Sequence, residues 1–443
     1  MQSFAENILK EQFRGEPTGI ASICSSSSEV LEAVLANSDS IEGKILIEAT
    51  CNQVNQFGGY TGRTPAEFRS WIFDKADKLN VDQEKLILGG DHLGVVPFQD
   101  EPEEKAMEKG REMAYEYARA GFKKLHLDAS PPLADDSLPL SDEKIARRTA
   151  ELCQAAEKGF AESSSAGIAG GEPPVYVAGS EVPSPGGEEA DNGDDNNGRG
   201  PTVTELAELQ NSLQAMKIAF QEKGLNEARD RVMAYVVQPG VEFAGFEVYD
   251  YWPEDFEDLS DYISSREQLV FEGHSTDYQT PEALKRMVAD GIAVLKVGPG
   301  LTFALREALF ALEAIAEELS WQLPEDSTVN FSEVLLSEMK ENPESWKNYY
   351  QGSREEIELA CRYSYFDRSR YYLSRPEVKA ARERLKENFN RLDVPPPLLR
   401  QYMPAQYREI RRGKYKPQAD NLIRSAVFNE LKPYLRAAGQ LRD

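Results

Sequence analysis

An acidic and an imidazole side chain stand side by side in the stretch LILGGDHLG at residues 86–94. The apolar start of this stretch predicts a buried strand, and Asp91 and His92 follow where the strand should end. Such a pair at a strand end can supply a base and a metal ligand at the mouth of a barrel. A structural interpretation also stays open for this stretch alone, with Asp91 capping the next helix beside a hydrogen-bonded histidine.

The three histidines of the chain share one kind of position. His92, His126 and His274 each lie at the end of a predicted strand, which chance alone would rarely produce. His126 lies within its strand, so a hydrogen-bonded lining role is an alternative for that residue. Imidazole and carboxylate groups together are the ligand set of Zn²⁺, Mn²⁺ or a similar divalent ion, with Ni²⁺ and Co²⁺ as further options. Such an ion could polarise a carbonyl and stabilise an enediolate.

The strand ends carry further candidate side chains. We predict that His92 and His274 bind the metal, with Glu181 or Asp128 completing the ligand set. The candidates for acid/base catalysis are Glu48 and Asp91 first, then Glu181 and Asp128. The expected substrate-binding residues are Asn52, Gln53, His126, Gln238, Asp277 and Lys296.

The eighth predicted strand runs into the sequence VGPGLTFALREAL at residues 297–309. Its Gly-Pro-Gly turn before a helix presents backbone N–H groups where barrels often hold phosphate. If the substrate is phosphorylated, the expected phosphate-binding residues are Lys296, Gly298, Gly300 and Thr302. The rival interpretation makes Lys296 an inward residue that pairs with Glu272 or Asp128 near the metal.

Eight short apolar runs alternate with amphipathic helical stretches along the chain. The predicted strands cover residues 19–26, 45–50, 86–92, 124–130, 175–183, 232–240, 269–275 and 293–299. This alternation predicts an α/β fold, either a (β/α)8 TIM barrel or a doubly wound open sheet, and the number of strands favours the barrel. Thr64 and Thr280, each followed by proline, predict the starts of two helices.

The alternation stops near residue 305, and a charged, aromatic-rich helical pattern follows. We expect a barrel over residues 1–318, with an exposed acidic loop at 184–201, and a helical C-terminal extension over 319–443 that packs on the barrel or at an oligomer contact. The extension contains RYSYFDRSRYY at residues 362–372, with three arginines and five aromatic residues. Packing is favoured over nucleic-acid binding for this segment, because the whole chain is acidic.

Composition limits the class of protein. Hydrophobic residues make up 40% of the 443 positions, enough for a large core, and the apolar runs are shorter than the roughly 18 residues of a membrane span. The net charge of −26 argues against nucleic acid or an anionic membrane as partner, although local cations could still hold an anionic substrate. The cysteines are isolated in sequence, which indicates reduced thiols in a cytoplasmic protein.

Seven long motifs span nearly the whole chain. They are IEATCNQVNQFGGYTGRTP (47–65), LILGGDHLG (86–94), KLHLDAS (124–130), GSEVPSPGG (179–187), VVQPGVEF (236–243), EGHSTDYQT (272–280) and LKVGPGLTFALREALFAL (295–312). Together they closely resemble the GatZ/KbaZ family, named for the non-catalytic subunit of class II D-tagatose-1,6-bisphosphate aldolase. The resemblance implies a TIM barrel related to class II aldolases, in which Asp91 is the acid/base and His92 binds zinc. It also implies a role in galactitol, tagatose or N-acetylgalactosamine catabolism.

Members of this family are also described as 4-epimerases of D-tagatose 6-phosphate and D-fructose 6-phosphate, some acting on free ketohexoses. Carbon 4 of a 2-ketose is not next to the carbonyl, so inversion can proceed by breaking and re-forming the C3–C4 bond with aldolase-like groups. A subunit that only stabilises a catalytic partner has no physical need for so many polar side chains at the ends of its strands. We therefore predict a metal-dependent 4-epimerase. The alternative is the non-catalytic aldolase subunit, with a class II aldolase catalytic subunit as partner, and either protein could be a homo-oligomer.

Overall fold

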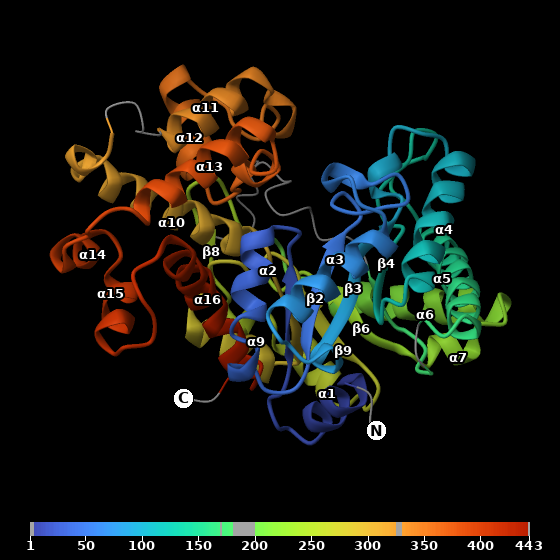
Figure 1. Ribbon diagram of the computed structural model, residues 1–443. Coiled ribbons are helices and arrows are strands. Elements are labelled where there is room, and N and C mark those ends of the chain that lie inside the picture. Colours follow the sequence, from blue (N-terminus) through green and yellow to red (C-terminus); the bar gives the residue numbers. More distant parts are fainter. Residues whose placement is uncertain (1–3, 169–170, 180–199, 325–329, 442–443) are drawn as a thin grey trace.

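Eight parallel strands close into a barrel in the computed structural model of this chain (Figure 1). The structure describes residues 4–168, 171–179, 200–324 and 330–441. The strands are β1 (Ile20–Cys24), β2 (Ile45–Thr50), β3 (Leu86–Gly94), β4 (Lys124–Asp128), β5 (Val175–Gly179), β6 (Val232–Val237), β9 (Val270–Gly273) and β10 (Ile292–Val297). Neighbours follow in the order β1-β10-β9-β6-β5-β4-β3-β2, and β2 pairs with β1. The predicted barrel is therefore confirmed, because an open sheet would leave two edge strands unpaired.

The barrel strands are apolar because both of their faces are covered. In β10, for example, all six residues of the sequence IAVLKV are buried. Outward side chains pack under the helices that follow the strands, and inward side chains fill the barrel. The eight predicted strands are all present, although β3 runs two residues longer than predicted and most of the others end earlier.

A helix follows each strand of the barrel, as the alternation of patterns predicts. These helices are α2 (Ser28–Leu35), α3 (Pro65–Lys78), α4 (Glu103–Arg119), α5 (Asp142–Ser165), α6 (Leu206–Glu222), α8 (Glu257–Ser264), α9 (Pro281–Ala289) and α10 (Pro299–Glu318). The short helix α7 (Asn226–Arg229) and the hairpin of β7 (Glu242–Phe243) with β8 (Val248–Tyr249) lie in connections. Both predicted helix starts are confirmed, since the Thr64 side chain accepts a hydrogen bond from the Glu67 N–H and Thr280 accepts one from Ala283.

The N-terminal helix α1 (Phe4–Phe13) closes the lower end of the barrel (Figure 1). Its buried Ala5 and Ile8 belong to one apolar cluster with the inward side chains of the strand beginnings, among them Leu46 and Val294. The lower half of the barrel is therefore a packed core that leaves the opposite end for chemistry.

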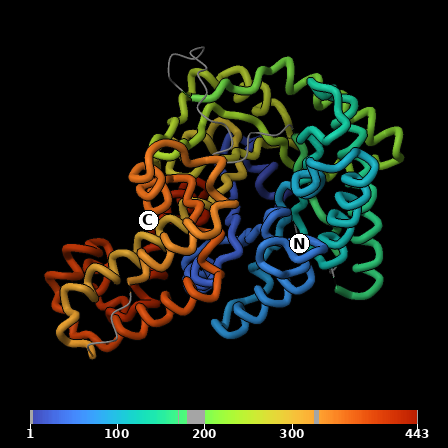
Figure 2. The backbone as a smooth tube through the Cα atoms, turned by 90° about the horizontal axis from the view of Figure 1, so that it is seen from above, coloured from blue at the N-terminus to red at the C-terminus, as the bar shows by residue number. Residues whose placement is uncertain are grey.

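The helices after α10 gather on one side of the barrel (Figure 2). They are α11 (Phe331–Glu341), α12 (Arg354–Tyr363), α13 (Pro376–Phe389), α14 (Pro396–Tyr402), α15 (Pro404–Arg411) and α16 (Ala419–Ala437). The last of them, α16, packs against α2, α9 and α10, and its Tyr434 hydroxyl donates to the Thr276 carbonyl at 2.8 Å. Beyond α16, the Gln440 side chain accepts a hydrogen bond from the Ala21 N–H at 2.8 Å. The end of the chain is thus part of the outer helical layer of the barrel.

Two further expectations concern covalent and membrane structure. The four cysteines are free thiols, in agreement with their isolated spacing. Within the described ranges, the helices lack the combination of length and apolar composition that crossing a bilayer requires.

Candidate active site

A local irregularity of β3 turns both Asp91 and His92 toward the barrel axis. Consecutive strand residues normally point to opposite faces. Here the pairing of β3 with β4 shifts register between Gly90 and Leu93, and His92 has a positive φ of 51°. A positive φ is uncommon for a residue other than glycine, and such outliers cluster at functional sites. The irregularity therefore allows two adjacent polar side chains to share one interior.

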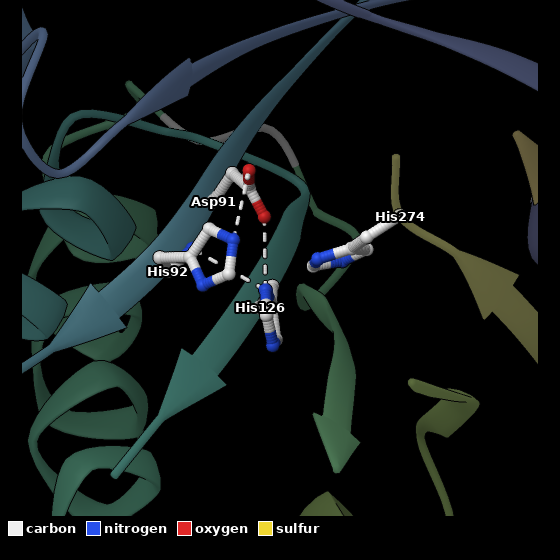
Figure 3. A group of neighbouring side chains, drawn as sticks. All are labelled: Asp91, His92, His126 and His274. Atoms are coloured by element: carbon white, nitrogen blue, oxygen red, sulfur yellow. Dashed lines mark hydrogen bonds and ion pairs between the residues drawn. The ribbon is translucent and has the colours of Figure 1, made fainter. Parts of the chain in front are cut away.

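The three histidines meet in one group, His92 from β3, His126 from β4 and His274 from the residue after β9 (Figure 3). The ring centres of His92 and His274 lie 4.9 Å apart, those of His92 and His126 4.9 Å, and those of His126 and His274 5.2 Å. One ligand atom from each ring and one from Asp91 all lie within 4.8 Å of one another. Four donors of this kind, three nitrogens and one oxygen, suit a tetrahedral divalent ion such as Zn²⁺.

Carboxylates orient each of the three imidazoles. Asp128 lies 2.8 Å from His92 Nδ1, Asp91 lies 2.9 Å from His126 Nδ1, and Glu272 lies 3.0 Å from His274 Nε2. In metal sites one ring nitrogen is commonly held in this way while the other binds the ion. The sequence-based ligand prediction named His92 and His274 with Glu181 or Asp128. The structure brings the predicted His92 and His274 together with His126 and Asp91, and Asp128 contacts the His92 ring at Nδ1.

A layer of ion pairs lies directly below the histidines. Lys124 Nζ lies 2.6 Å from a carboxylate oxygen of Glu48 and 2.6 Å from one of Glu272. Lys296 Nζ lies 2.7 Å from Glu48, 2.5 Å from Asp91 and 3.5 Å from Glu272. All five side chains are buried. Because a buried charge needs a partner, these lysines and carboxylates hold each other in fixed positions.

The electrostatics follow from burial and from these pairs. Burial would raise the pKa of Glu272, but the Lys124 and Lys296 ammonium groups outweigh burial and hold that pKa well below its usual value. Burial would likewise lower the pKa of His92, but the Asp91 and Asp128 carboxylates raise it to about 9. For His274 burial dominates, and its pKa falls to about 4. The carboxylates therefore favour the charged form of His92, whereas burial favours the neutral form of His274.

A cavity of about 730 Å³ opens above this layer. Asp91, His92, His274 and Lys296 line its floor, and Asn52, Gln53 and Asp277 are among its walls, as a substrate-binding role requires. The predicted residues Glu48, His126, Asp128 and Gln238 are not among the described residues that line it. Glu181 and most of the acidic loop lie outside the described residues.

The residues of the cavity therefore differ in what they can contact. Glu48 does not line the cavity but contacts Lys296 and Cys24, which do, whereas Asp91 lies on the cavity floor beside the histidines and can touch a bound sugar. Gln238 turns back on its own segment, where its side-chain oxygen accepts a hydrogen bond from the Gly240 N–H at 2.8 Å.

The start of α10 was the expected phosphate site. Asp277 already accepts hydrogen bonds there, from the Gly298 N–H at 2.9 Å and the Gly300 N–H at 2.7 Å. Thr302 donates to Asp367, and Lys296 points into the ion-pair layer, as its rival interpretation describes. The phosphate role of these groups stays a prediction, and a phosphate there would have to replace the Asp277 carboxylate.

Some residues of the site were not predicted from the sequence. Lys124 stands two positions before His126 in KLHLDAS, so strand alternation places both on one face and could have identified it. Arg368, Arg370 and Tyr371 also line the cavity, although they come from the C-terminal extension. No local pattern marks these three as neighbours of the barrel mouth, because only tertiary packing brings them there.

Comparisons with known proteins show what this chain is similar to. Residues 5–439 match a family described as D-tagatose-1,6-bisphosphate aldolase subunit GatZ/KbaZ-like. A crystal structure of a probable tagatose 6-phosphate kinase from Sinorhizobium meliloti 1021 is similar over 95% of this chain and 100% of its own, with 40% sequence identity and a TM-score of 0.84. The YdjI aldolase from Escherichia coli K12 is a distant match, with 14% identity over 84% of this chain and 94% of its own, and a TM-score of 0.39.

Proposed function

Because this chain belongs to the GatZ/KbaZ-like family and has three histidines and Asp91 gathered beside a cavity, we propose that it is a metal-dependent ketohexose 4-epimerase. It interconverts D-fructose and D-tagatose, or their 6-phosphates. The observation that carries the proposal is the group of donor atoms from Asp91, His92, His126 and His274, all within 4.8 Å of one another, of which Asp91, His92 and His274 line a cavity of about 730 Å³. This is the size of a small-molecule site, and its polar groups converge on one point.

The three histidines would hold the metal, with Asp91 as the nearby carboxylate. Imidazole nitrogen with carboxylate oxygen suits Zn²⁺ first, and Mn²⁺, Ni²⁺ or Co²⁺ as alternatives. When bound, the ion acts as a Lewis acid toward the carbonyl and hydroxyl oxygens of C2 and C3. Asp128 and Glu272 keep the His92 and His274 rings in orientation.

Inversion at C4 proceeds by retro-aldol and aldol steps. A base removes the proton of the C4 hydroxyl, the C3–C4 bond breaks, and its electron pair moves toward the C2 carbonyl oxygen. The C4 aldehyde rotates, the C3–C4 bond re-forms on its other face, and the proton returns to the C4 oxygen. Asp91 is the carboxylate for this proton exchange, because it lines the cavity, and Lys296 at 2.5 Å stabilises its negative charge. Glu48 positions Lys296 from below.

A second function is favoured by the family description itself, which names an aldolase subunit. In that case the chain would stabilise a class II aldolase catalytic subunit, and the cavity would not turn over a sugar. The two functions differ in one measurable respect, namely whether the chain alone converts a ketohexose.

The test uses the purified chain alone. After chelation and reloading with each divalent metal, it is mixed with fructose 6-phosphate or fructose, and tagatose products are followed by NMR. We expect conversion that depends on the metal. Absence of conversion with every metal, together with stabilisation of an added aldolase subunit, would instead establish the accessory role.

The variant Asp91→Asn should lower turnover by about 10²- to 10⁴-fold, the usual contribution of a general acid or base. Metal content should remain measurable, because the three histidines are retained. The matched control is Asp39→Asn, the same chemical change at an exposed position, which should leave turnover unchanged. Equal activity of both variants would remove Asp91 from the reaction.

A further inference from the structure

A segment of the C-terminal extension lies over the barrel mouth. The 3-10 turn Arg368–Tyr371 stands between α12 and α13, and Arg368, Arg370 and Tyr371 line the same cavity as His92 and Lys296. From the sequence, these residues were interpreted as packing. Their position gives the cavity two chemically different ends, one with imidazoles and carboxylates and the other with guanidinium groups.

Asp367 fixes this segment to the barrel. It adopts a left-handed conformation with φ 42°, and its carboxylate accepts hydrogen bonds from Ser369 at 2.7 Å and from Thr302 of α10 at 2.5 Å. The Arg306 guanidinium lies 3.5 Å from the same carboxylate and provides its counter-charge. Asp367 therefore anchors the turn, and its close ion pair is with Arg306 rather than with Arg368 or Arg370.

The two arginines lack a close ion pair in the described part of the chain, although Arg370 is attracted at longer range to Asp367 and Asp277. Within the described ranges, neither Arg368 nor Arg370 has a carboxylate oxygen within 4.0 Å of its guanidinium. Arg368 is only 6% exposed, stacks 3.2 Å from the centre of the Tyr349 ring, and leaves its Nε without a hydrogen-bond partner. A buried guanidinium without an anion is costly, so the arrangement points to a ligand that brings one.

Both arginines converge on Tyr371. Arg368 Nη1 lies 3.4 Å from the Tyr371 hydroxyl oxygen and Arg370 Nη2 lies 3.3 Å from it. Burial would raise the pKa of Tyr371, but the Arg370 and Arg368 charges outweigh burial and lower it. The lowered pKa reports a positive potential at this end of the cavity.

We propose that Arg368, Arg370 and Tyr371 bind the phosphate of a phosphorylated ketohexose. This inference depends on the proposed function in one respect. It takes the reacting carbons of the sugar to lie at the imidazole end of the same cavity. A phosphate monoester carries about −1.5 to −2 charges at pH 7, which matches two guanidinium groups, and arginine is suited to its oxygens by geometry. The start of α10 is less suited, because Asp277 occupies its N–H groups.

The test measures binding by calorimetry, with fructose 6-phosphate and fructose as probes and the full metal-loaded chain. Arg370→Gln and Arg368→Gln should each weaken fructose 6-phosphate binding by about 10- to 100-fold, the range for hydrogen bonds to charged groups, and change fructose binding by less than about twofold. The matched control is Lys386→Gln, which removes a cation from the same cavity wall that is already paired with Asp420 at 2.8 Å. It should change neither affinity by more than about threefold.

The remaining outcomes decide the proposal. If a glutamine variant fails to fold, Arg370→Lys keeps the charge, and with it inorganic phosphate should still compete with fructose 6-phosphate, though more weakly than in the unmodified chain. Equal weakening of both sugars by the arginine variants would overturn the proposal. So would a phosphate-specific loss in Lys296→Ala that the arginine variants do not share. Calorimetry needs no turnover, so an inactive but phosphate-selective chain would refute the epimerase and still support this site.

Discussion

The two halves of the barrel interior use the same strands for opposite purposes. β2 contributes Leu46 to the lower half and Glu48 to the upper half. β10 contributes Val294 and Lys296 in the same way. The lower residues pack with α1 in an apolar cluster, whereas the upper ones form ion pairs. On each of these strands, two inward-facing residues that are two positions apart therefore belong to different regions, one to the apolar core and the next to the candidate active site.

The two halves should therefore differ in which amino-acid substitutions they tolerate. The lower half depends on volume and apolarity, so it should accept other side chains of similar size. The upper half depends on pairing, because each buried charge is satisfied only by its neighbours. Removing one charge there should disturb several residues at once.

The largest effect is expected in the upper half from Lys124→Met. This change removes the ammonium group that lies 2.6 Å from both Glu48 and Glu272 and leaves Lys296 as their remaining partner. Breaking a buried pair typically costs about 3–5 kcal/mol. Urea unfolding should measure the loss of free energy. The control Lys109→Met removes the cation of a partly exposed pair with Glu101 and should cost less than about 1 kcal/mol. Equal losses in the two variants would mean that the charged layer is not stabilised by its pairing.

A smaller effect is expected in the lower half from Ile8→Ala. Ile8 is 4% exposed in the apolar cluster, and truncation of such a side chain costs about 2 kcal/mol where the neighbours can relax. Metal content should not change, because α1 packs with the strand beginnings, whereas the histidines lie toward the other ends of β3, β4 and β9. Lys10→Ala, at an exposed position of the same helix, serves as control in the same unfolding experiment. Loss of metal in Ile8→Ala would show that the two halves are coupled.

The smallest effect is expected from Asp128→Asn, which alters one orienting contact. The amide keeps a hydrogen-bonding group near His92 Nδ1 but removes the negative charge at 2.8 Å. Loss of such a partner usually lowers metal affinity by about 10- to 100-fold, and competition with a coloured chelator would measure it. An unchanged affinity would mean that His92 does not bind the ion.

The sequence by itself determined the elements and the chemistry at their ends. Apolar runs, the Thr64 helix cap and the strand-end histidines are local features, and local patterns specify strands and helices. The same patterns identified His92, His126 and His274 as a set before any distance was known. The family resemblance was also readable at this level, since the motifs are continuous stretches of chain.

Tertiary structure alone decided which of these groups meet. Barrel closure brings the ring centres of His274 and His92 to 4.9 Å from each other, although the two residues are 182 positions apart in the sequence. It also directs Lys296 toward Glu48 and Asp91, and packing of the extension carries Arg370 to the cavity. The physical reason is the distance along the chain over which each effect acts. Strand alternation fixes the face of a residue within its own element, whereas the distance between elements depends on the packing of the whole chain.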